Sequence, residues 1–203
     1  AAQAQSRMDA GDAGGAVAIW EKALAEAGPV VLAQLETVAA DKGHTIFNVG
    51  MDGDNDHRLT YIHLGICAAL LLNSKAVDFV VAGCGTGQGA MMSLNAWPGV
   101  YCGYCIEPTD AFLFAQVNNG NALALPFAKG YGWGAEINIR YIFEKAFDGE
   151  RGQGYPAERK ESQMTNAGIL AAQILALGDP DLAGRLSAFR AAQTDGVAET
   201  VED

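Results

Sequence analysis

Segments with helical spacing of apolar residues alternate with short, continuously apolar segments along the chain. Helix is predicted at 17–42, 60–73, 89–95, 109–117, 134–147 and 156–192. Strand is predicted at 44–49, 76–82, 99–106 and 122–127, where β-rich or continuously apolar runs occur. Within the first helical segment, Gly28-Pro29 predicts that one helix ends and another begins, because proline disrupts a helix interior.

Strands that alternate with helices predict an α/β fold, with a doubly wound, mostly parallel sheet in a Rossmann-like three-layer sandwich and an extended C-terminal helix. Ligands bind such sheets beyond the carboxyl ends of the strands. We therefore expect the loops at 83–89 and 107–110 and the turn at 118–121 near that edge. Because no linker or repeat is visible, residues 1–203 are predicted to form a single domain, with a flexible acidic tail at 193–203.

The formal net charge of the chain is −11 at pH 7. Nucleic acids and anionic membranes require a basic surface, so neither is an expected partner. No run approaches the roughly 20 apolar residues of a membrane span, and no signal-peptide pattern opens the chain. The sequence therefore predicts a cytoplasmic protein. In such an acidic protein, an anionic substrate would be held by local positive potential from loops and helix N-termini.

Cys102 and Cys105 have the CxxC spacing that metal sites and redox disulfides use. Both lie in the predicted strand at 99–106, where residues three positions apart point to opposite faces. The two thiols therefore cannot share a metal ion or form a disulfide there. Two buried free thiols are expected instead.

The segment Gly83–Gly89 reads Gly-Cys-Gly-Thr-Gly-Gln-Gly and follows a predicted buried strand. Its glycines allow the backbone to approach a ligand and to turn successive N–H groups toward it. The N-terminus of the next helix adds a partial positive charge and favours a thiolate beside it. The loop is therefore predicted to hold an anion or a developing oxyanion, with Cys84 as nucleophile or general base and the Thr86 hydroxyl nearby.

Residues 85–90 also fit the pattern G-x-G-x-x-A of dinucleotide-binding loops, and Glu107 lies about 20 residues further on, where such folds place a ribose-binding acid. An enzyme that uses NAD or S-adenosylmethionine is therefore an alternative. Against this alternative, the strand before the loop comes late in the chain, and Cys84 is unusual for a cofactor loop.

The glycine loop, followed by 95–100, Glu107-Pro108 and 118–124, resembles the ribose-5-phosphate isomerase B and galactose-6-phosphate isomerase family in order and spacing, over about half the chain. That family interconverts aldose and ketose phosphates of carbohydrate metabolism without a metal or cofactor. A base moves a proton between C1 and C2 through a cis-enediolate, and the glycine loop stabilises its negative oxygen. The resemblance therefore implies a cofactor-free isomerase that acts on a ribose- or galactose-type sugar phosphate.

The resemblance also assigns residues. Cys84 matches the catalytic base and Thr86 the loop threonine that binds a substrate oxygen. Some members have serine at the cysteine position and use a glutamate six residues later, but here that position is Ala90, so Cys84 alone can be the base. The substrate-binding residues that the resemblance implies are Tyr61, Gly85, Gly87, Gly89, Asn118 and Arg159. A left-handed turn cap would explain Asn118 equally well.

Several positions depart from the family pattern. The N-terminal strand that ends in Asp-His is not found, the position of the ring-opening histidine holds Val117, and that of a phosphate-binding arginine falls at about Tyr155. Arg151, His57 and His63 are possible replacements, each also explained as an ordinary structural or surface residue. These departures leave open a different sugar phosphate, an open-chain sugar or an unphosphorylated one as the substrate.

Because family sites are completed by a neighbouring subunit, the resemblance implies a homodimer or homotetramer with shared sites. Ile142, Phe143 and Phe147 are candidate interface residues, although core packing explains them as well. The altered residues leave a third alternative, a non-catalytic sugar-phosphate sensor or partner subunit.

Overall fold

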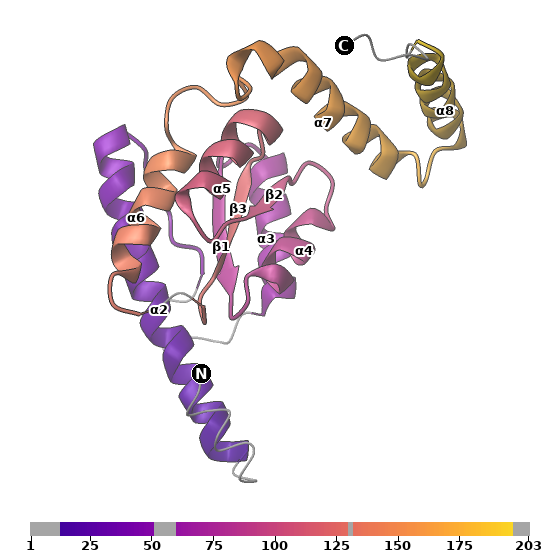
Figure 1. Ribbon diagram of the computed structural model, residues 1–203. Helices are drawn as coiled ribbons and strands as arrows, with labels where there is room; N and C mark the ends of the chain where they lie inside the picture. The colour runs from indigo at the N-terminus through magenta and orange to yellow at the C-terminus, as the bar shows by residue number, and fades with distance from the viewer. Residues whose placement is uncertain (1–12, 51–59, 130–131, 197–203) are drawn as a thin grey trace, which may run out of the picture. The chain divides into compact units, whose positions relative to one another are not determined.

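The computed structural model describes residues 13–50, 60–129 and 132–196 (Figure 1). The chain divides into two compact units, Ala1–Arg151 and Gly152–Asp203. No helix in the described part of the chain is both long enough and apolar enough to cross a lipid bilayer. The single-domain assignment stays a prediction.

A small parallel sheet lies at the centre of the first unit (Figure 1). Its strands are β1 (Val80–Cys84), β2 (Cys102–Tyr104) and β3 (Ala122–Pro126), in the order β1-β3-β2, and both outer strands pair in parallel with β3. Every residue of β3 is buried, as expected for a strand covered on both faces. Because the strands are parallel, their last residues all lie at one edge, the carboxyl edge of the sheet.

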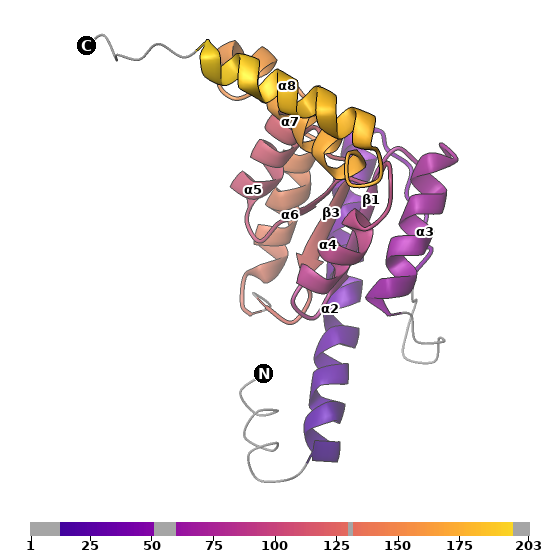
Figure 2. The same cartoon turned by 90° about the vertical axis from the view of Figure 1, so that its right-hand side faces the viewer.

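Helices cover both faces of this sheet (Figures 1 and 2). One buried cluster joins the sheet to α3 (Tyr61–Asn73) and α4 (Gln88–Asn95). The other cluster joins it to α2 (Ala13–Lys42), α5 (Pro108–Leu113) and α6 (Ala135–Ala146). This arrangement of helix, sheet and helix confirms the predicted α/β sandwich.

Packing in the core accounts for the three candidate interface residues on and after α6. Ile142 and Phe143 are fully buried on α6, and Phe147 packs against the same cluster. Their apolar character is accounted for by the packing of α6 on the sheet.

Helix α2 continues through Pro29, so the predicted break is wrong. Ala27, Val31 and Val38 are buried on both sides of the proline, at spacings that place them on one helix face. Continuing the helix keeps this apolar stripe against α6. The burial outweighs the hydrogen bond that proline removes.

The strand predicted at 44–49 is also wrong, because this segment has no regular secondary structure and pairs with no described strand. Phe47 and Val49 are exposed there. A β-rich composition forms a strand only where a neighbouring edge accepts it. The strand predicted at 76–82 is real but begins and ends later, at Val80 and Cys84.

The helix predicted at 109–117 begins at Pro108 and changes after Leu113 into η1 (Phe114–Asn118), a π-helical turn. The N-cap is Glu107 rather than Thr109 or Asp110. Asp110 still stabilises the helix start, because its carboxylate accepts hydrogen bonds from the N–H groups of Ile106 (2.9 Å) and Glu107 (3.3 Å). These bonds fix the turn that leaves β2.

The two CxxC cysteines point to opposite faces of the sheet, as the strand pattern predicts. Cys102 belongs to the cluster under α3 and α4, whereas Cys105 belongs to the cluster under α5 and α6. Both thiols are free and buried, and burial raises the pKa of each to about 12. They therefore stay protonated at neutral pH and pack as core residues.

The second unit contains η2 (Ala157–Arg159), α7 (Lys160–Leu175) and α8 (Pro180–Asp195). The single long helix predicted at 156–192 is therefore interrupted between α7 and α8. Asp179 causes a new helix to start there, because its side chain accepts a hydrogen bond from the Leu182 N–H group at 3.0 Å. The end of the predicted acidic tail lies outside the described residues.

Candidate functional site

The glycine loop after β1 is tied to the end of β3. The carbonyl oxygen of Cys84 accepts hydrogen bonds from the N–H groups of Gly87 (3.2 Å) and Phe127 (2.8 Å). The carbonyl oxygen of Gly85 accepts a third from the Ala128 N–H group (2.8 Å). These bonds hold Cys84 at the carboxyl edge of the sheet, with a half-buried side chain.

Helix α4 begins inside this loop. Gly87 is its N-cap, with a left-handed φ of 75°, and accepts the first helical hydrogen bond from the Met91 N–H group at 3.0 Å. The N–H groups of Gln88, Gly89 and Ala90 therefore have no acceptor within the helix. Together with the helix dipole, they can hold an anion without a basic side chain. Thr86 is exposed beside them.

Tyr61 lies against the first turn of α4. A methyl group on Gly89 would be 3.4 Å from two atoms of the Tyr61 ring. Tyr61 is the first residue of α3, and His63 supports this helix start, because its Nδ1 accepts a hydrogen bond from the Thr60 N–H group at 3.1 Å. This bond gives His63 a structural role in capping α3. The other candidate histidine, His57, lies outside the described residues.

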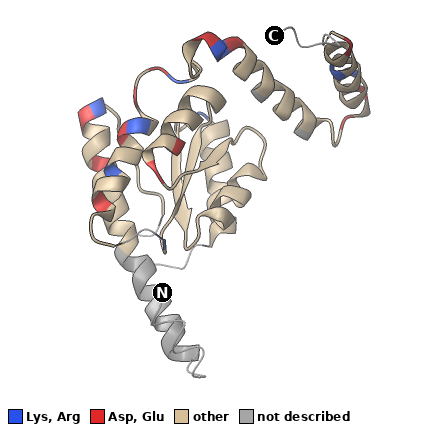
Figure 3. Cartoon of the chain, viewed as in Figure 1, with Lys and Arg blue, Asp and Glu red and all other residues tan. Residues whose placement is uncertain are grey.

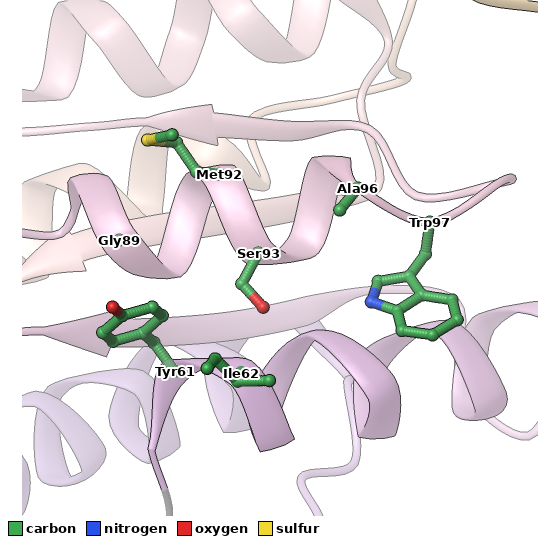
Figure 4. A pocket seen from close by; sticks show the side chains of 7 residues that line it. All are labelled: Tyr61, Ile62, Gly89, Met92, Ser93, Ala96 and Trp97. Atoms are coloured by element: carbon green, nitrogen blue, oxygen red, sulfur yellow. The ribbon is translucent and has the colours of Figure 1, made fainter.

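A groove of about 450 Å³ lies between α3 and α4 (Figure 4). Tyr61 and Gly89 lie toward one end of it and Trp97 toward the other (Figure 4). The full lining is Tyr61, Ile62, Gly89, Met92, Ser93, Ala96 and Trp97. Cys84 does not line the groove, so the groove adjoins the glycine loop through Tyr61 and Gly89.

Asn118 lies at the opposite edge of the sheet from Cys84. Cys84 pairs with Pro126 at the end of β3, whereas Asn118 precedes the start of β3. The length of β3 alone separates them by about 13 Å. The expectation that the 118–121 turn lies near the carboxyl edge is therefore wrong. The left-handed residue of this turn is Asn119, with a φ of 49°, so a turn cap does not account for Asn118.

The two arginines considered for an anion lie elsewhere. Arg151 donates hydrogen bonds to the carbonyl oxygens of Gly120 and Ala146, and its guanidinium lies 4.6 Å from the centre of the Phe79 ring. Burial lowers the pKa of Arg151 from its ordinary value. Arg159 is exposed in η2 of the second unit. Within the first unit, Arg151 therefore lies beside Gly120 at the amino edge of the sheet, and not beside Cys84.

Tyr104 lies beside the glycine loop, although the sequence analysis does not identify it as a candidate. It is the last residue of β2, and its Cε2 atom would be 2.6 Å from a Cβ atom on Gly87. The segment 99–106 suggested only a buried strand. Its alternation nevertheless puts Tyr104 on the same face as Cys102, and that pattern would have been the signal.

Among the described residues, no group of three or more His, Cys, Asp or Glu side chains could hold a metal ion. Around the glycine loop, the described residues offer groups suited to acid–base chemistry: a thiol at Cys84, hydroxyls at Thr86, Tyr61 and Tyr104, and a backbone anion site at the start of α4.

A family model described as ribose/galactose isomerase matches residues 22–154 of this chain. Among solved structures, the chain is similar to a ribose-5-phosphate isomerase from Vibrio parahaemolyticus, with 61% identity and a TM-score of 0.72 over 81% of this chain and 77% of that one. No relative was found among curated proteins.

A second solved structure, a 4-deoxy-L-threo-5-hexosulose-uronate ketol-isomerase complexed with a tartrate, shares 45% identity and a TM-score of 0.70, over 80% of this chain and 82% of that one. A ribose-5-phosphate isomerase B from Mycoplasma genitalium with bound ribulose-5-phosphate has 19% identity and a TM-score of 0.53, over 68% of this chain and 88% of that one. This last similarity concerns the fold.

Proposed function

Because the chain belongs to the ribose/galactose isomerase family, we propose that it is an aldose–ketose isomerase that needs no cofactor and uses Cys84 as its base. The observation that carries the proposal is the position of Cys84, half-buried at the carboxyl edge and directly before the first turn of α4. A thiolate there can take a proton from carbon while the N–H groups of α4 hold the oxygen that becomes negative.

The proposed reaction moves one carbon-bound proton. Cys84 removes the proton from C2 of an open-chain aldose, and the electrons of that bond form the C1–C2 double bond of an enediolate. The charge that develops on O1 lies at the backbone N–H groups of Gln88 and Gly89. Cys84 then returns the proton to C1 while the proton on O2 passes to O1, and the two transfers together give the ketose. The Tyr61 ring beside Gly89 and the Thr86 hydroxyl would orient the substrate.

The first candidate substrate is a phosphorylated pentose or hexose. Ribose-5-phosphate is named for the relative with 61% identity. The phosphate would require a cation, and Arg159 is the residue that the family resemblance proposes for it.

The second candidate substrate is an unphosphorylated keto-uronate, the class named for the relative with 45% identity. Its name describes a ketone at C5 and no hydroxyl at C4, so it lacks the hydroxyl groups that close a sugar ring at those carbons. An isomerase of such a compound needs no ring-opening histidine, and Val117 occupies that position. It also needs no phosphate site, and Arg151 is engaged with the carbonyl groups of Gly120 and Ala146.

Replacement of Cys84 tests the proposal. In deuterated water, the wild-type protein should exchange the carbon-bound hydrogen of ribose-5-phosphate, galactose-6-phosphate or the 4-deoxy-5-hexosulose-uronate, as followed by proton NMR. Cys84→Ala should abolish both exchange and conversion, because no other group replaces the base, while the circular dichroism spectrum stays unchanged. Cys67→Ala removes an exposed thiol from α3 and should behave as wild type.

Unchanged exchange in Cys84→Ala would refute the proposed base. If the wild-type protein converts none of the three compounds but is thermally stabilised by one, a non-catalytic binding protein is the better description. Micromolar binding of NAD or S-adenosylmethionine in equilibrium dialysis would favour the cofactor alternative.

We further propose that the active unit is a homodimer whose sites combine residues of both copies. A site that contains both Cys84 and Asn118 takes Asn118 from a second copy, because β3 separates the two within one chain. Helices α3 and α4 contain no Lys, Arg, Asp or Glu (Figure 3). Exposed apolar side chains on and just after them, Ile62, Ile66, Leu70, Met92 and Trp97, supply a surface for that contact.

A further inference from the structure

The ring of Tyr104 lies against the glycine loop that holds Cys84. A Cβ atom on Gly87 would be 2.6 Å from Cε2 of Tyr104, so the ring touches the loop backbone where α4 begins. The side chain is only partly buried. Its hydroxyl therefore remains accessible to a ligand bound at this edge.

The register of the sheet places Tyr104 and Cys84 on the same face. Ala82 of β1 and Cys102 of β2 both belong to the cluster under α4, and side chains two positions further along each strand point the same way. Cys84 pairs with Pro126 and Tyr104 pairs with Ala124, so β3 lies between them. Two strand spacings, combined with the two-residue offset between Pro126 and Ala124, give a separation of about 12 Å between their Cα atoms, which leaves room for the carbon chain of a small sugar.

The electrostatic surroundings keep the Tyr104 hydroxyl protonated. Its pKa is raised, first by desolvation and then by the charges of Asp110 and Cys84. Asp110 is engaged with the N–H groups of Ile106 and Glu107, so it fixes the turn while Tyr104 keeps a proton to donate.

We propose that Tyr104 is a second catalytic residue, which moves the proton between O1 and O2 while Cys84 moves the proton between C2 and C1. This inference rests on the proposed isomerase function. After Cys84 has formed the enediolate, the Tyr104 O–H bond breaks and its proton goes to O1. The tyrosinate then takes the proton from O2, and the carbonyl forms at C2 as C1 takes the proton from Cys84. Both groups end as they began, and no oxidant or reductant is needed.

Tyr104→Phe removes the hydroxyl and keeps the ring against Gly87. General acid–base groups contribute about 100-fold or more, so kcat should fall about 100-fold with a smaller change in KM. In deuterated water, the ratio of deuterium exchange into the substrate to conversion into product should rise. Cys84 can still exchange the carbon-bound proton, whereas the proton transfer between O1 and O2 that product formation needs is slowed. Tyr141→Phe, on an exposed turn of α6, is the matched control and should behave as wild type.

Unchanged kcat and an unchanged ratio of exchange to conversion in Tyr104→Phe would overturn the role of Tyr104 and leave the isomerase proposal intact. The absence of any exchange by the wild-type protein would instead refute the isomerase proposal.

A measurement without substrate then decides whether Tyr104 serves the Cys84 thiol. Iodoacetamide carries a carbonyl next to the carbon that Cys84 attacks, and methyl methanethiosulfonate carries none. Tyr104→Phe should slow modification of Cys84 by iodoacetamide severalfold and leave modification by methyl methanethiosulfonate unchanged, as followed by peptide mass spectrometry. Equal effects on both reagents, or none, would refute the placement of the Tyr104 hydroxyl beside the carbonyl.

Discussion

Gly87 is a position where backbone conformation and packing both require glycine. Its φ of 75° is a left-handed conformation that side chains with a Cβ atom rarely adopt. That Cβ atom would also be 2.6 Å from the Tyr104 ring and 2.9 Å from the backbone of Leu125. Tyr104 of β2 and Leu125 of the central strand β3 thus both pack against the loop in which α4 begins.

Gly87→Ala should therefore lower the free energy of unfolding by more than the strain of its backbone conformation alone. Gly43 has nearly the same φ, 76°, and nothing within 4 Å of its Cβ position, so Gly43→Ala isolates the conformational cost of about 1 kcal/mol. Gly87→Ala should lower the free energy of unfolding by clearly more than this and should reduce activity sharply. Urea unfolding of both variants measures the difference, and equal losses would show that packing at Gly87 contributes nothing.

Residue properties that depend on local pattern could be predicted from the sequence. The opposite orientation of Cys102 and Cys105 follows from strand alternation alone, and the glycine loop from its composition. The contact of Tyr104 with Gly87 could not be predicted, because it depends on the strand order β1-β3-β2. That order is set by pairing between residues far apart in the sequence, which no local pattern records. The edge at which Asn118 lies, by contrast, follows from its place just before β3 in a parallel sheet.

At the level of elements, α3, α4, α6 and β3 agree with their predicted segments to within about two residues, which is the usual uncertainty of helix ends. The segments that differ are those where tertiary contacts override local preference. Packing keeps α2 helical on both sides of Pro29, and the segment at 44–49 lacks a strand partner among the described residues. The contact between α3 and α4 is a further case in which packing opposes helix propensity.

Gly65→Ala in α3 tests this contact. Alanine in a helix interior is normally favoured over glycine by about 1 kcal/mol. At Gly65, however, a Cβ atom would be 2.3 Å from Oγ and 2.5 Å from the backbone oxygen of Ser93 in α4. We expect Gly65→Ala to lower the melting temperature and, by shifting Tyr61 from Gly89, to raise KM.

Gly168 supplies the control, since it lies within α7 with nothing within 4 Å of its Cβ position. Gly168→Ala should raise or preserve the melting temperature of the same full-length protein. A stabilising Gly65→Ala would mean that α3 and α4 are not held at this separation in solution.

At the scale of the whole molecule, α3 and α4 form an uncharged surface on an acidic chain. The chain carries a net charge of −11, yet α3 and α4 are free of charged residues (Figure 3). Ile62, Ile66 and Leu70 follow one another at four-residue intervals on α3 and are exposed. A two-fold interface uses the same patch on both copies, so an uncharged patch avoids placing like charges opposite each other.

A mixed-dimer experiment tests whether each site takes residues from two copies. Cys84→Ala and Asn118→Ala should each be almost inactive alone. When the two are refolded together, about half of the dimers are mixed and each has one intact site, so about a quarter of wild-type activity should return. Turnover assays on the mixture measure this recovery. A mixture as inactive as its parents would show that Cys84 of one copy and Asn118 of the other do not form a common site.

The N–H groups at the start of α4 have a consequence for how such a protein can change during evolution. A charge held by backbone N–H groups does not depend on the identity of a side chain. Substitutions at Thr86 or Gln88 therefore leave these N–H groups in place. Selection can then alter the side chains around the loop, such as Tyr61 and Tyr104, without first rebuilding the part that faces the reacting oxygen. A single backbone turn can thereby serve lineages whose substrates end in different anionic groups, and their divergence need not pass through an inactive ancestor.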